Sequence, residues 1–310
     1  MLFRWAGATA VRLAVATFCI VVSVCPGATV TLIPSADATL IEIVPDNSMG
    51  AAAYFTAGTT QNGPRNRAVL KFDIASAIAA GSKITAVSLT VDAIKQSREA
   101  PAGASYGLHR LLRSWGEGNN LAESQPGLGS PAGPNDATWN ARFFPTNRWA
   151  QPGGAEGTDY LAQVTSTVIV DLLDVYQFDN TFELIAEIQF WLDHPDQNFG
   201  WLLKGESEEI RFTARQFASR EYADPALAPQ LAVEFIPPPH VDIARTNDGG
   251  IGLTVTPAEA GSYVLEFQGT LGGTNGWSTL TNFGFVAAQT VLAARDTSSA
   301  AQRFYRARPQ

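Results

Sequence analysis

The sequence predicts an all-β protein: a jelly-roll-like β-sandwich of residues 29–236 followed by a small β-module of residues 240–310. Three observations lead to this fold class. Apolar and polar residues alternate with a period of two in many short segments, and long segments with a period of 3.6 residues are scarce. The alternation stops at three consecutive prolines, residues 237–239, and starts again after them, which places a domain boundary there.

The first 28 residues have the pattern of an export signal. Arg4 and Arg12 precede an apolar run at residues 13–24, and small residues follow it. The run is shorter than the about 20 apolar residues that a membrane-spanning helix needs. We predict cleavage after Gly27 or Ala28, a secreted protein that resides outside the cell or on its surface, and no membrane insertion of the mature chain.

Both cysteines, Cys19 and Cys25, lie within this signal. The mature chain is therefore predicted to have no disulfide, no thiolate nucleophile and no cysteine metal site. Hydrophobic burial alone must hold the fold. With 45% hydrophobic residues and about 280 residues after cleavage, the chain is long enough for one domain of about 200 residues and a smaller second one.

The predicted mature chain is acidic. Of 21 basic side chains two lie in the signal, which leaves 19 against 29 acidic ones and a formal charge of −10. A protein of this charge is repelled by nucleic acid at long range, so nucleic acid is excluded as a partner. A local cationic stripe could still bind an anionic sugar polymer.

Nine segments of the larger domain alternate as strands do: 29–33, 39–44, 67–72, 84–94, 106–112, 164–171, 201–204, 211–217 and 230–235. Residues 172–192 differ, because apolar residues recur there at spacings of three and four. This spacing predicts helical turns broken near residues 179–181 and a helix before the strand at 201–204.

A long segment at residues 96–160 is rich in Gly, Pro and Asn and also carries many aromatic residues. Loops of this length in a compact domain tend to be functional or to be ordered by their own side chains. We expect this one to fold over an end of the two sheets.

In the smaller module, strands are expected at 252–256, 263–268, 277–282, 290–294 and 304–307, with turns at 248–250 and 275–276. The segments GSYVLEF, WSTL and RFYR resemble the small immunoglobulin- or fibronectin-like modules that follow many secreted bacterial proteins.

Two predicted strands carry alternating cations. In the first, Arg65, Arg67, Val69 and Lys71 share one face. In the second, Arg211, Thr213, Arg215 and Phe217 do so. If the predicted strands 67–72 and 211–217 are neighbours, the four cations Arg67, Lys71, Arg211 and Arg215 lie on one sheet face, where guanidinium groups suit the carboxylates of uronic acids. The alternatives are a half-buried strand shielded by the Arg and Lys stems, and ion pairs with the acids nearby in sequence, Glu206, Glu208, Glu209 and Glu221.

Tryptophans could provide stacking surfaces for sugar rings. Trp191 and Trp201 lie on a predicted helix and a predicted strand, and we expect them in the core. Trp115, Trp139 and Trp149 lie in the long loop segment and are the better candidates for ligand contact.

No cofactor is predicted, although a structural calcium ion is one interpretation of Asp37, Asp46, Asn47 and Asp73. The alternative is turn chemistry, in which short polar side chains bond their own backbone. For catalysis, no HExxH, GxSxG or phosphate-binding glycine loop is present, and we predict that the protein is not an enzyme. A lyase or hydrolase with two acids brought together by the fold is the alternative.

Five sequence blocks in a common order carry a family resemblance: RAVLKFD (67–73), SWGEG (114–118), ATWN (137–140), WAQPGG (149–154) and NFGWLLKGESEEIRFTARQFASRE (198–221). Over roughly residues 36–235 the chain thereby resembles the DNRLRE-domain proteins, which are family 96 carbohydrate-binding modules. The resemblance implies a domain that binds polysaccharide without cleaving it, with alginate-like or other acidic algal polymers as the leading ligands.

From the alternation we predict that Arg67, Lys71 and Arg215 contact sugar carboxylates or sulfates, with Arg211 and Arg220 as alternates and Trp115 or Trp139 as stacking surfaces. Because the mature chain is acidic, a neutral algal or plant glycan remains the other ligand class. The rival function is that of a structural or adhesion protein of the cell surface or matrix, for which we expect an exposed apolar patch or an unpaired edge strand.

Overall fold

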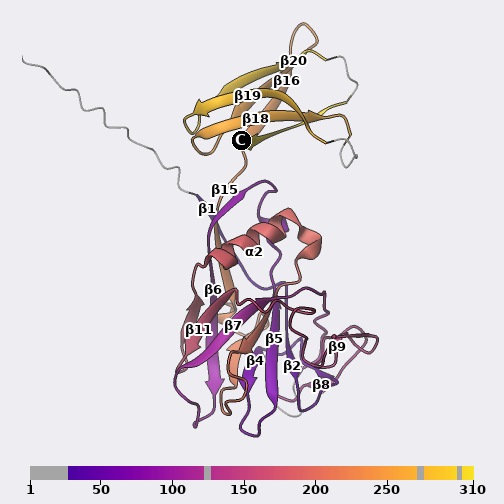
Figure 1. Ribbon diagram of the computed structural model, residues 1–310, viewed down its shortest axis with the longest axis vertical. Helices are drawn as coiled ribbons and strands as arrows, with labels where there is room; N and C mark the ends of the chain where they lie inside the picture. The colour runs from indigo at the N-terminus through magenta and orange to yellow at the C-terminus, as the bar shows by residue number, and fades with distance from the viewer. Residues whose placement is uncertain (1–26, 122–126, 271–275, 299–301) are drawn as a thin grey trace, which may run out of the picture.

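The computed structural model describes residues 27–121, 127–270, 276–298 and 302–310. Two bodies are visible in Figure 1, and the chain passes from one to the other at residues 237–239. The predicted export signal lies outside the described residues, except for Gly27 and Ala28. Among the described residues, no helix has the length and apolar character needed to cross a membrane.

The larger body is built from one curled antiparallel sheet. Its strands follow the order β1-β15-β6-β14-β4-β5-β13-β7-β11, with β12 also paired to β6 and β2 to β5. The bounds are β1 (Ala28–Leu32), β2 (Ala36–Ile41), β4 (Tyr54–Thr59), β5 (Arg65–Lys71), β6 (Lys83–Gln96), β7 (Ala104–Arg110), β11 (Ser166–Val170), β12 (Val175–Phe178), β13 (Trp201–Gly205), β14 (Arg215–Ala218) and β15 (Gln230–Ile236).

The sheet folds over at the β4–β5 hairpin. These two strands pair only next to their turn, where Gly58 faces Asn66 and Thr59 faces Arg65. Beyond that point β4 pairs with β14, and β5 pairs with β2 and β13. Two layers result, one around β5 and one around β14.

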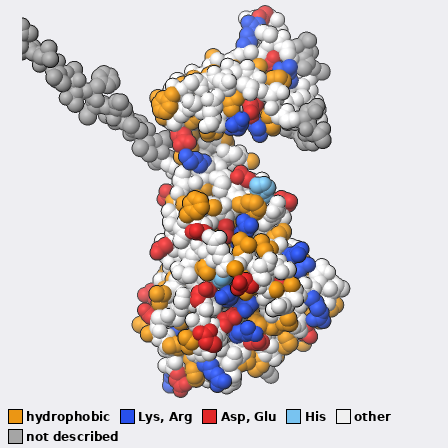
Figure 2. Space-filling model, in the orientation of Figure 1, with side chains coloured by type: hydrophobic (Ala, Val, Ile, Leu, Met, Phe, Trp, Pro, Cys, Tyr) orange, Lys and Arg blue, Asp and Glu red, His pale blue; other side chains and the backbone are white. Residues whose placement is uncertain are grey.

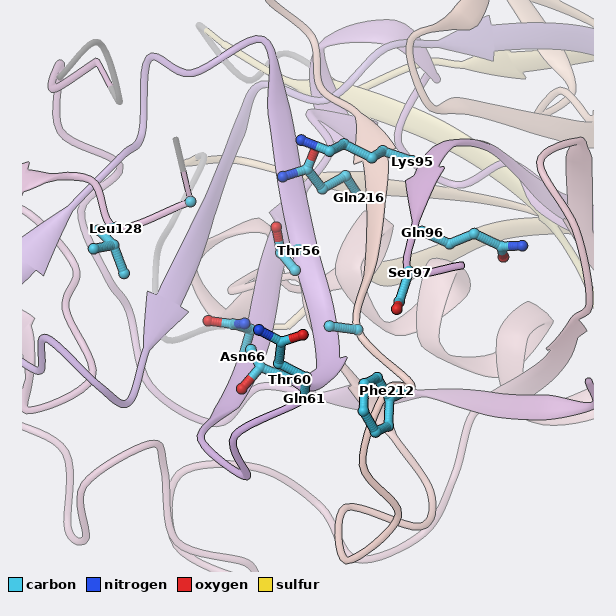
Figure 3. A pocket seen from close by; sticks show the side chains of 12 residues that line it. Thr56, Thr60, Gln61, Asn66, Lys95, Gln96, Ser97, Leu128, Phe212 and Gln216 are labelled. Carbon is cyan, nitrogen blue, oxygen red and sulfur yellow. The ribbon is translucent and has the colours of Figure 1, made fainter. Parts of the chain in front are cut away.

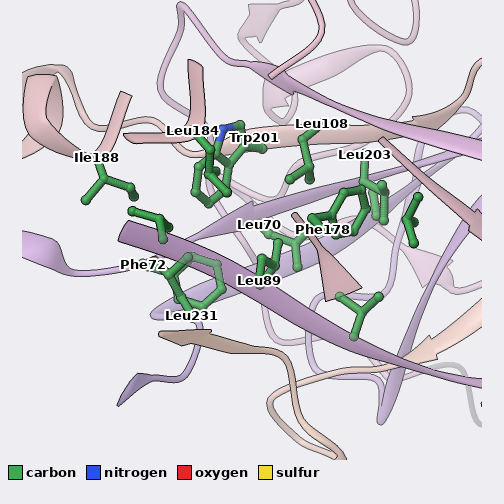
Figure 4. Close-up of a cluster of buried hydrophobic side chains, with 14 of the residues drawn as sticks. Leu70, Phe72, Leu89, Leu108, Phe178, Leu184, Ile188, Trp201, Leu203 and Leu231 are labelled. Carbon is green, nitrogen blue, oxygen red and sulfur yellow. The ribbon is translucent and has the colours of Figure 1, made fainter. Parts of the chain in front are cut away.

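The main core lies between these layers. In β6, Val87, Leu89 and Val91 are buried and alternate with less buried polar residues, as the period of two predicts. Figure 4 shows Leu89 together with Leu70 of β5, Leu203 of β13 and Leu231 of β15. The predicted all-β sandwich is confirmed, and its jelly-roll character stays a prediction.

Helix α2 (Phe182–Asp193) lies against the core. The hydroxyl of Thr181 caps its N-terminus by accepting a hydrogen bond from the N–H of Leu184. Trp191 of the helix contacts Trp201 of β13, with 4.6 Å between ring centroids, and both are fully buried. The core positions predicted for these tryptophans are therefore confirmed. The helical interpretation of residues 172–178 is wrong, because Val175–Phe178 forms β12 beside β6.

The long loop covers a face of the sheet instead of an end. Trp139, Trp149 and Tyr160 from this loop pack on Val69 of β5 and Leu202 of β13 and form a second buried cluster. Strand β5 is consequently buried on both faces. The minor elements are β3 (Asn47–Ser48), β8 (Ser130–Pro131), β9 (Ala141–Phe143), β10 (Asn147–Arg148), α1 (Ile74–Ala77), η1 (Pro195–Gln197) and η2 (Pro225–Leu227).

The smaller body contains two three-stranded antiparallel sheets, β16-β17-β20 and β19-β18-β21. Leu253, Val255 and Leu265 form its core. These sheets agree with the small β-module that the sequence predicts. The likeness of this module to immunoglobulin or fibronectin modules stays a prediction. The bounds are β16 (His240–Arg245), β17 (Ile251–Thr256), β18 (Gly261–Gln268), β19 (Ser278–Val286), β20 (Leu292–Asp296) and β21 (Phe304–Pro309).

Candidate functional site

Arg67 is not presented to solvent. Its guanidinium binds both carboxylate oxygens of Glu208, and its Nη1 donates to the carbonyl of Gly153 at 2.8 Å. The long loop places the Trp139 ring 5.5 Å from the guanidinium carbon. The predicted ligand contact of Arg67 is therefore wrong, because the loop covers the face on which the cation lies and Glu208 neutralises it.

Arg215 is also buried, with no exposed surface. Strand β14 pairs with β4 and β6, not with β5, so the two cationic strands are not neighbours. The Arg215 guanidinium donates to the backbone carbonyls of Phe212 and Pro101. The prediction that Arg215 contacts a ligand is wrong, and so is the prediction of four cations on one face.

The predicted strand at 211–217 begins only at Arg215. Phe212 before it has a left-handed backbone with φ of 63°. The hydroxyl of Thr213 accepts from the N–H of Thr59 and donates to the carbonyl of Ile210. These bonds hold the segment as a turn, which alternation alone does not reveal.

Arg220 lies among three carboxylates. Its Nη2 is 2.7 Å from Glu117 and its Nε is 2.7 Å from Glu221. The backbone N–H of Arg220 donates to Asp37, which is 2% exposed. Burial raises the pKa of Asp37 to about 8, and the nearby Glu221 and Glu117 charges add to this rise. Arg220 is thus exposed, and its guanidinium is ion-paired with Glu117 and Glu221.

One oxygen from each of Asp37, Glu117 and Glu221 lies within 4.8 Å of the others. Such oxygens are the ligands that Ca²⁺ prefers, so these three residues could hold a cation. The other residues considered for calcium have partners within the protein: Asp46 accepts from the Asn140 side chain, Asn47 donates to the carbonyl of Leu128, and Asp73 caps α1. Of these three side chains only that of Asp73 bonds nearby backbone, at the N–H of Ser76. The bonds of the Asp46 and Asn47 side chains reach residues far along the chain, which is not the bonding to their own backbone that the turn interpretation predicts.

The candidate tryptophans are not exposed stacking surfaces. Trp139 and Trp149 are buried in the second cluster, and Trp149 donates to the carbonyl of Thr138. Trp115 is half-buried against the same cluster and donates to the carbonyl of Phe199. The prediction of Trp139 as a sugar platform is wrong, because this ring is buried beneath the long loop. For the half-buried Trp115 the sugar contact stays a prediction.

Besides the ion-paired Arg220, two predicted cations remain accessible. Lys71 is half-buried at the end of β5, and within the described residues it makes no ion pair. Arg211 is exposed, and its guanidinium lies beside the turn at Gly63. The structure does not bring these two together with Arg67 or Arg215.

A groove of about 450 Å³ lies on the β4–β14–β6 layer. Figure 3 shows Lys95 and Gln216 at one end of it and Phe212, Gln61 and Asn66 at the other. The lining is formed by Thr56, Thr60, Gln61, Asn66, Lys95, Gln96, Ser97, Gly127, Leu128, Phe212, Ala214 and Gln216.

The register of the sheet aligns the polar side chains of this groove. Gln216 of β14 faces Thr56 of β4 on one side and Lys95 of β6 on the other. Directly opposed residues project from the same face, so these three side chains form a row. Within the described residues the side chains of Gln61, Lys95 and Gln216 make no hydrogen bond or ion pair, so their donors and acceptors are available to a ligand.

Sequence reasoning missed this groove for two reasons. Strand β4 was not predicted, because Ala57 and Gly58 interrupt its alternation. The pairing of β14 with β4 and β6 is long-range and leaves no local pattern. The one available signal was Gln216, whose side chain must point away from Arg215 on the same strand.

Comparison of the chain with protein-family models and with curated proteins gives no match. The resemblance to the DNRLRE-domain proteins therefore stays a prediction, and the assignment of function rests on the geometry described above.

Proposed function

We propose that the larger domain is an exported, non-catalytic module that binds polysaccharide in the β4–β14–β6 groove. The observation that supports this best is the row of polar side chains Thr56, Gln216 and Lys95, with the Phe212 ring at the other end of the groove. Sugar hydroxyls donate and accept hydrogen bonds, and a carboxamide can do both at once. An aromatic ring packs against the apolar face of a pyranose.

The size of the groove fits such a ligand. Its volume of about 450 Å³ falls within the roughly 300 to 1,000 Å³ of typical small-ligand pockets. The floor is a sheet whose opposite face contributes Phe55 and Phe217 to the main core. A floor anchored in this way is rigid, so little ordering is needed when a ligand binds.

The charge of the groove is weaker support for an acidic ligand than its polar side chains are for a sugar in general. Lys95 is the cation of the groove, and the exposed Arg211 lies beyond the Gln61 and Gly63 turn. One ammonium group can bind the carboxylate of an alginate-like polymer, and the carboxamides serve neutral algal or plant glycans equally well. Both ligand classes belong to the proposal.

Affinity electrophoresis of the mature protein in gels containing alginate, xylan or laminarin tests the proposal. We expect retardation in at least one gel and a clear loss of retardation for Gln216→Ala. The matched control is Gln177→Ala, which removes the same group from the exposed strand β12 and should keep the wild-type mobility shift. Equal shifts for both variants, or no shift of the wild type in any gel, would contradict binding in this groove.

A specific observation also favours the rival structural function. Strand β11 lies at one end of the strand order, and Ile169, Leu172, Leu173 and Val175 on and after it are exposed. Exposed apolar side chains beside an open strand edge are suited to contact with another protein. Sedimentation over a range of concentrations tests this function: self-association that Ile169→Lys abolishes would support it, and a monomer at all concentrations would argue against self-contact.

A further inference from the structure

Two arginines of the C-terminal module share one carboxylate. Arg306 and Arg308 are alternate residues of β21 and project from the same face toward Glu266 of β18. Arg306 Nε lies 2.8 Å from Glu266 Oε2, and Arg308 Nη2 lies 3.0 Å from Oε1. Both hydrogen bonds lower the pKa of Glu266, that from Arg308 most, so this carboxylate is ionised at neutral pH.

This arrangement leaves one positive charge without a counter-charge. Glu266 is buried, whereas the side chains of Arg306 and Arg308 are 45% and 51% exposed. One carboxylate balances one guanidinium, and among the described residues the second guanidinium has no other ion-pair partner. Elsewhere in the module, Arg295 faces Asp248 and Arg303 faces Asp296, each in a one-to-one pair. Other arginines of this module therefore each have a carboxylate of their own, and the sharing of Glu266 by two arginines is not a general feature of the module.

The donors that face away from Glu266 are available and fixed in place. Both Nη groups of Arg306 make no hydrogen bond within the described residues. The guanidinium carbon of Arg306 lies 4.3 Å from the centroid of the Trp277 ring, which holds its plane. A guanidinium that is oriented before binding loses less freedom when it captures an oxyanion.

A cavity adjoins this arginine pair. It has a volume of about 820 Å³, and its wall includes Arg306, Arg308, Tyr305 and the proline spacer Pro237–Pro239. Figure 2 shows basic atoms gathered on the side of the C-terminal module that faces the larger domain. The prolines and the tyrosine give the cavity an apolar side on which a sugar ring can rest, next to the two cations.

We infer that Arg306 and Arg308 form an oxyanion site that takes the carboxylate or sulfate group of an acidic polysaccharide. This site is separate from the groove of the larger domain and does not depend on the function proposed for it. Uronate and sulfate ester present the same chemistry, a planar or tetrahedral set of oxygens that pairs with guanidinium N–H groups. The site gives the C-terminal module a binding role of its own.

The test is affinity electrophoresis of the full mature chain in gels of alginate, of dextran sulfate and of neutral xylan. The double variant R306Q/R308Q should bind the anionic polymers about three- to thirtyfold more weakly, as expected for two exposed charge contacts. The matched control R245Q/R295Q removes the same total charge from the same module and should keep wild-type retention. Loss in the alginate gel alone identifies uronate as the ligand, and loss in the dextran sulfate gel alone identifies sulfate.

Equal retention of the two double variants would overturn the oxyanion site, as would a wild type that neither anionic gel retards. A second variant guards against misfolding: Glu266→Gln removes the competing carboxylate and should increase retention by anionic polymers, which an unfolded module would not do. Failure of the arginine site can be distinguished from failure of the groove. The effect of Gln216→Ala is measured in a gel that still retards the R306Q/R308Q protein, in which the arginine site no longer contributes to binding.

Discussion

Arg67 and Glu208, which are 141 positions apart, form a two-pronged ion pair beneath the long loop, with Nε–Oε1 at 2.7 Å and Nη2–Oε2 at 2.6 Å. Removing one partner leaves the other charge partly desolvated. We expect Glu208→Gln and Arg67→Ala each to lower the free energy of unfolding by about 3 kcal/mol, measured by urea denaturation.

Arg67→Lys should not restore this stability, because an ammonium cannot reproduce the paired geometry of the guanidinium. Polysaccharide retention of the folded variants should be unchanged. A variant of Arg67 with wild-type stability and lost retention would show that this cation contacts the ligand after all.

Stability should depend on pH through Asp37. Because burial raises the pKa of its carboxyl to about 8, the folded protein keeps a proton that the unfolded chain releases near its ordinary pKa of about 4. This contribution is fully present below pH 4 and is lost as the pH rises toward 8, at up to about 1.4 kcal/mol per pH unit. Asp37→Asn keeps an oxygen for the Arg220 N–H and should flatten this decline in urea unfolding at pH 5 to 8. Equal slopes for the two proteins would contradict the raised pKa.

Lys95 should decide between acidic and neutral ligands at the groove. Lys95→Gln is expected to weaken retention by alginate a few-fold and to reduce its dependence on salt, because one charge contact of up to about 1 kcal/mol is lost. Retention by xylan should not change. Lys83→Gln, which alters charge equally at an exposed position of the same strand, is the control. If both variants behave alike, net charge and not the groove sets the preference.

Gly153 should tolerate no side chain. Its φ is +83°, and a Cβ atom there would lie 2.5 Å from the Trp139 ring. Gly153→Ala is expected to lower stability by about 2 to 4 kcal/mol, through backbone strain and displacement of the ring. Gly157→Ala is the control that measures backbone strain alone, because φ is +76° there and no atom lies within 4 Å of the added Cβ. It should lower stability by only about 1 kcal/mol. Similar thermal denaturation midpoints for both would show that Trp139 moves freely.

The sequence predicts the strands of this fold better than their surroundings. Alternation correctly places Leu70 and Val69 on opposite faces of β5. The apolar residues that flank Trp191 and Trp201 in the sequence correctly predict that both tryptophans are buried. Alternation does not reveal what covers each face. A cation such as Arg67 is typical of a solvent-exposed face, yet the long loop covers this face and a glutamate distant in sequence pairs with the arginine.

The candidate site could not be predicted from local pattern, because it depends on which strands pair. The row formed by Thr56, Gln216 and Lys95 exists only through the register of β14 between β4 and β6. Those residue types are common on exposed strands and mark no chemistry by themselves. Arg306 and Arg308 were hidden for the same reason, since Glu266 faces them only across a strand pair.

The β4–β5 hairpin links the two layers of the larger domain into one sheet through the residues that pair next to its turn. Neither layer can open without loosening residues that the other requires, so the amide protons of β6 and β13 should exchange with solvent in a single cooperative event. A domain assembled in this way is either folded as a whole or unfolded, and a force applied to one layer cannot peel it away from the other.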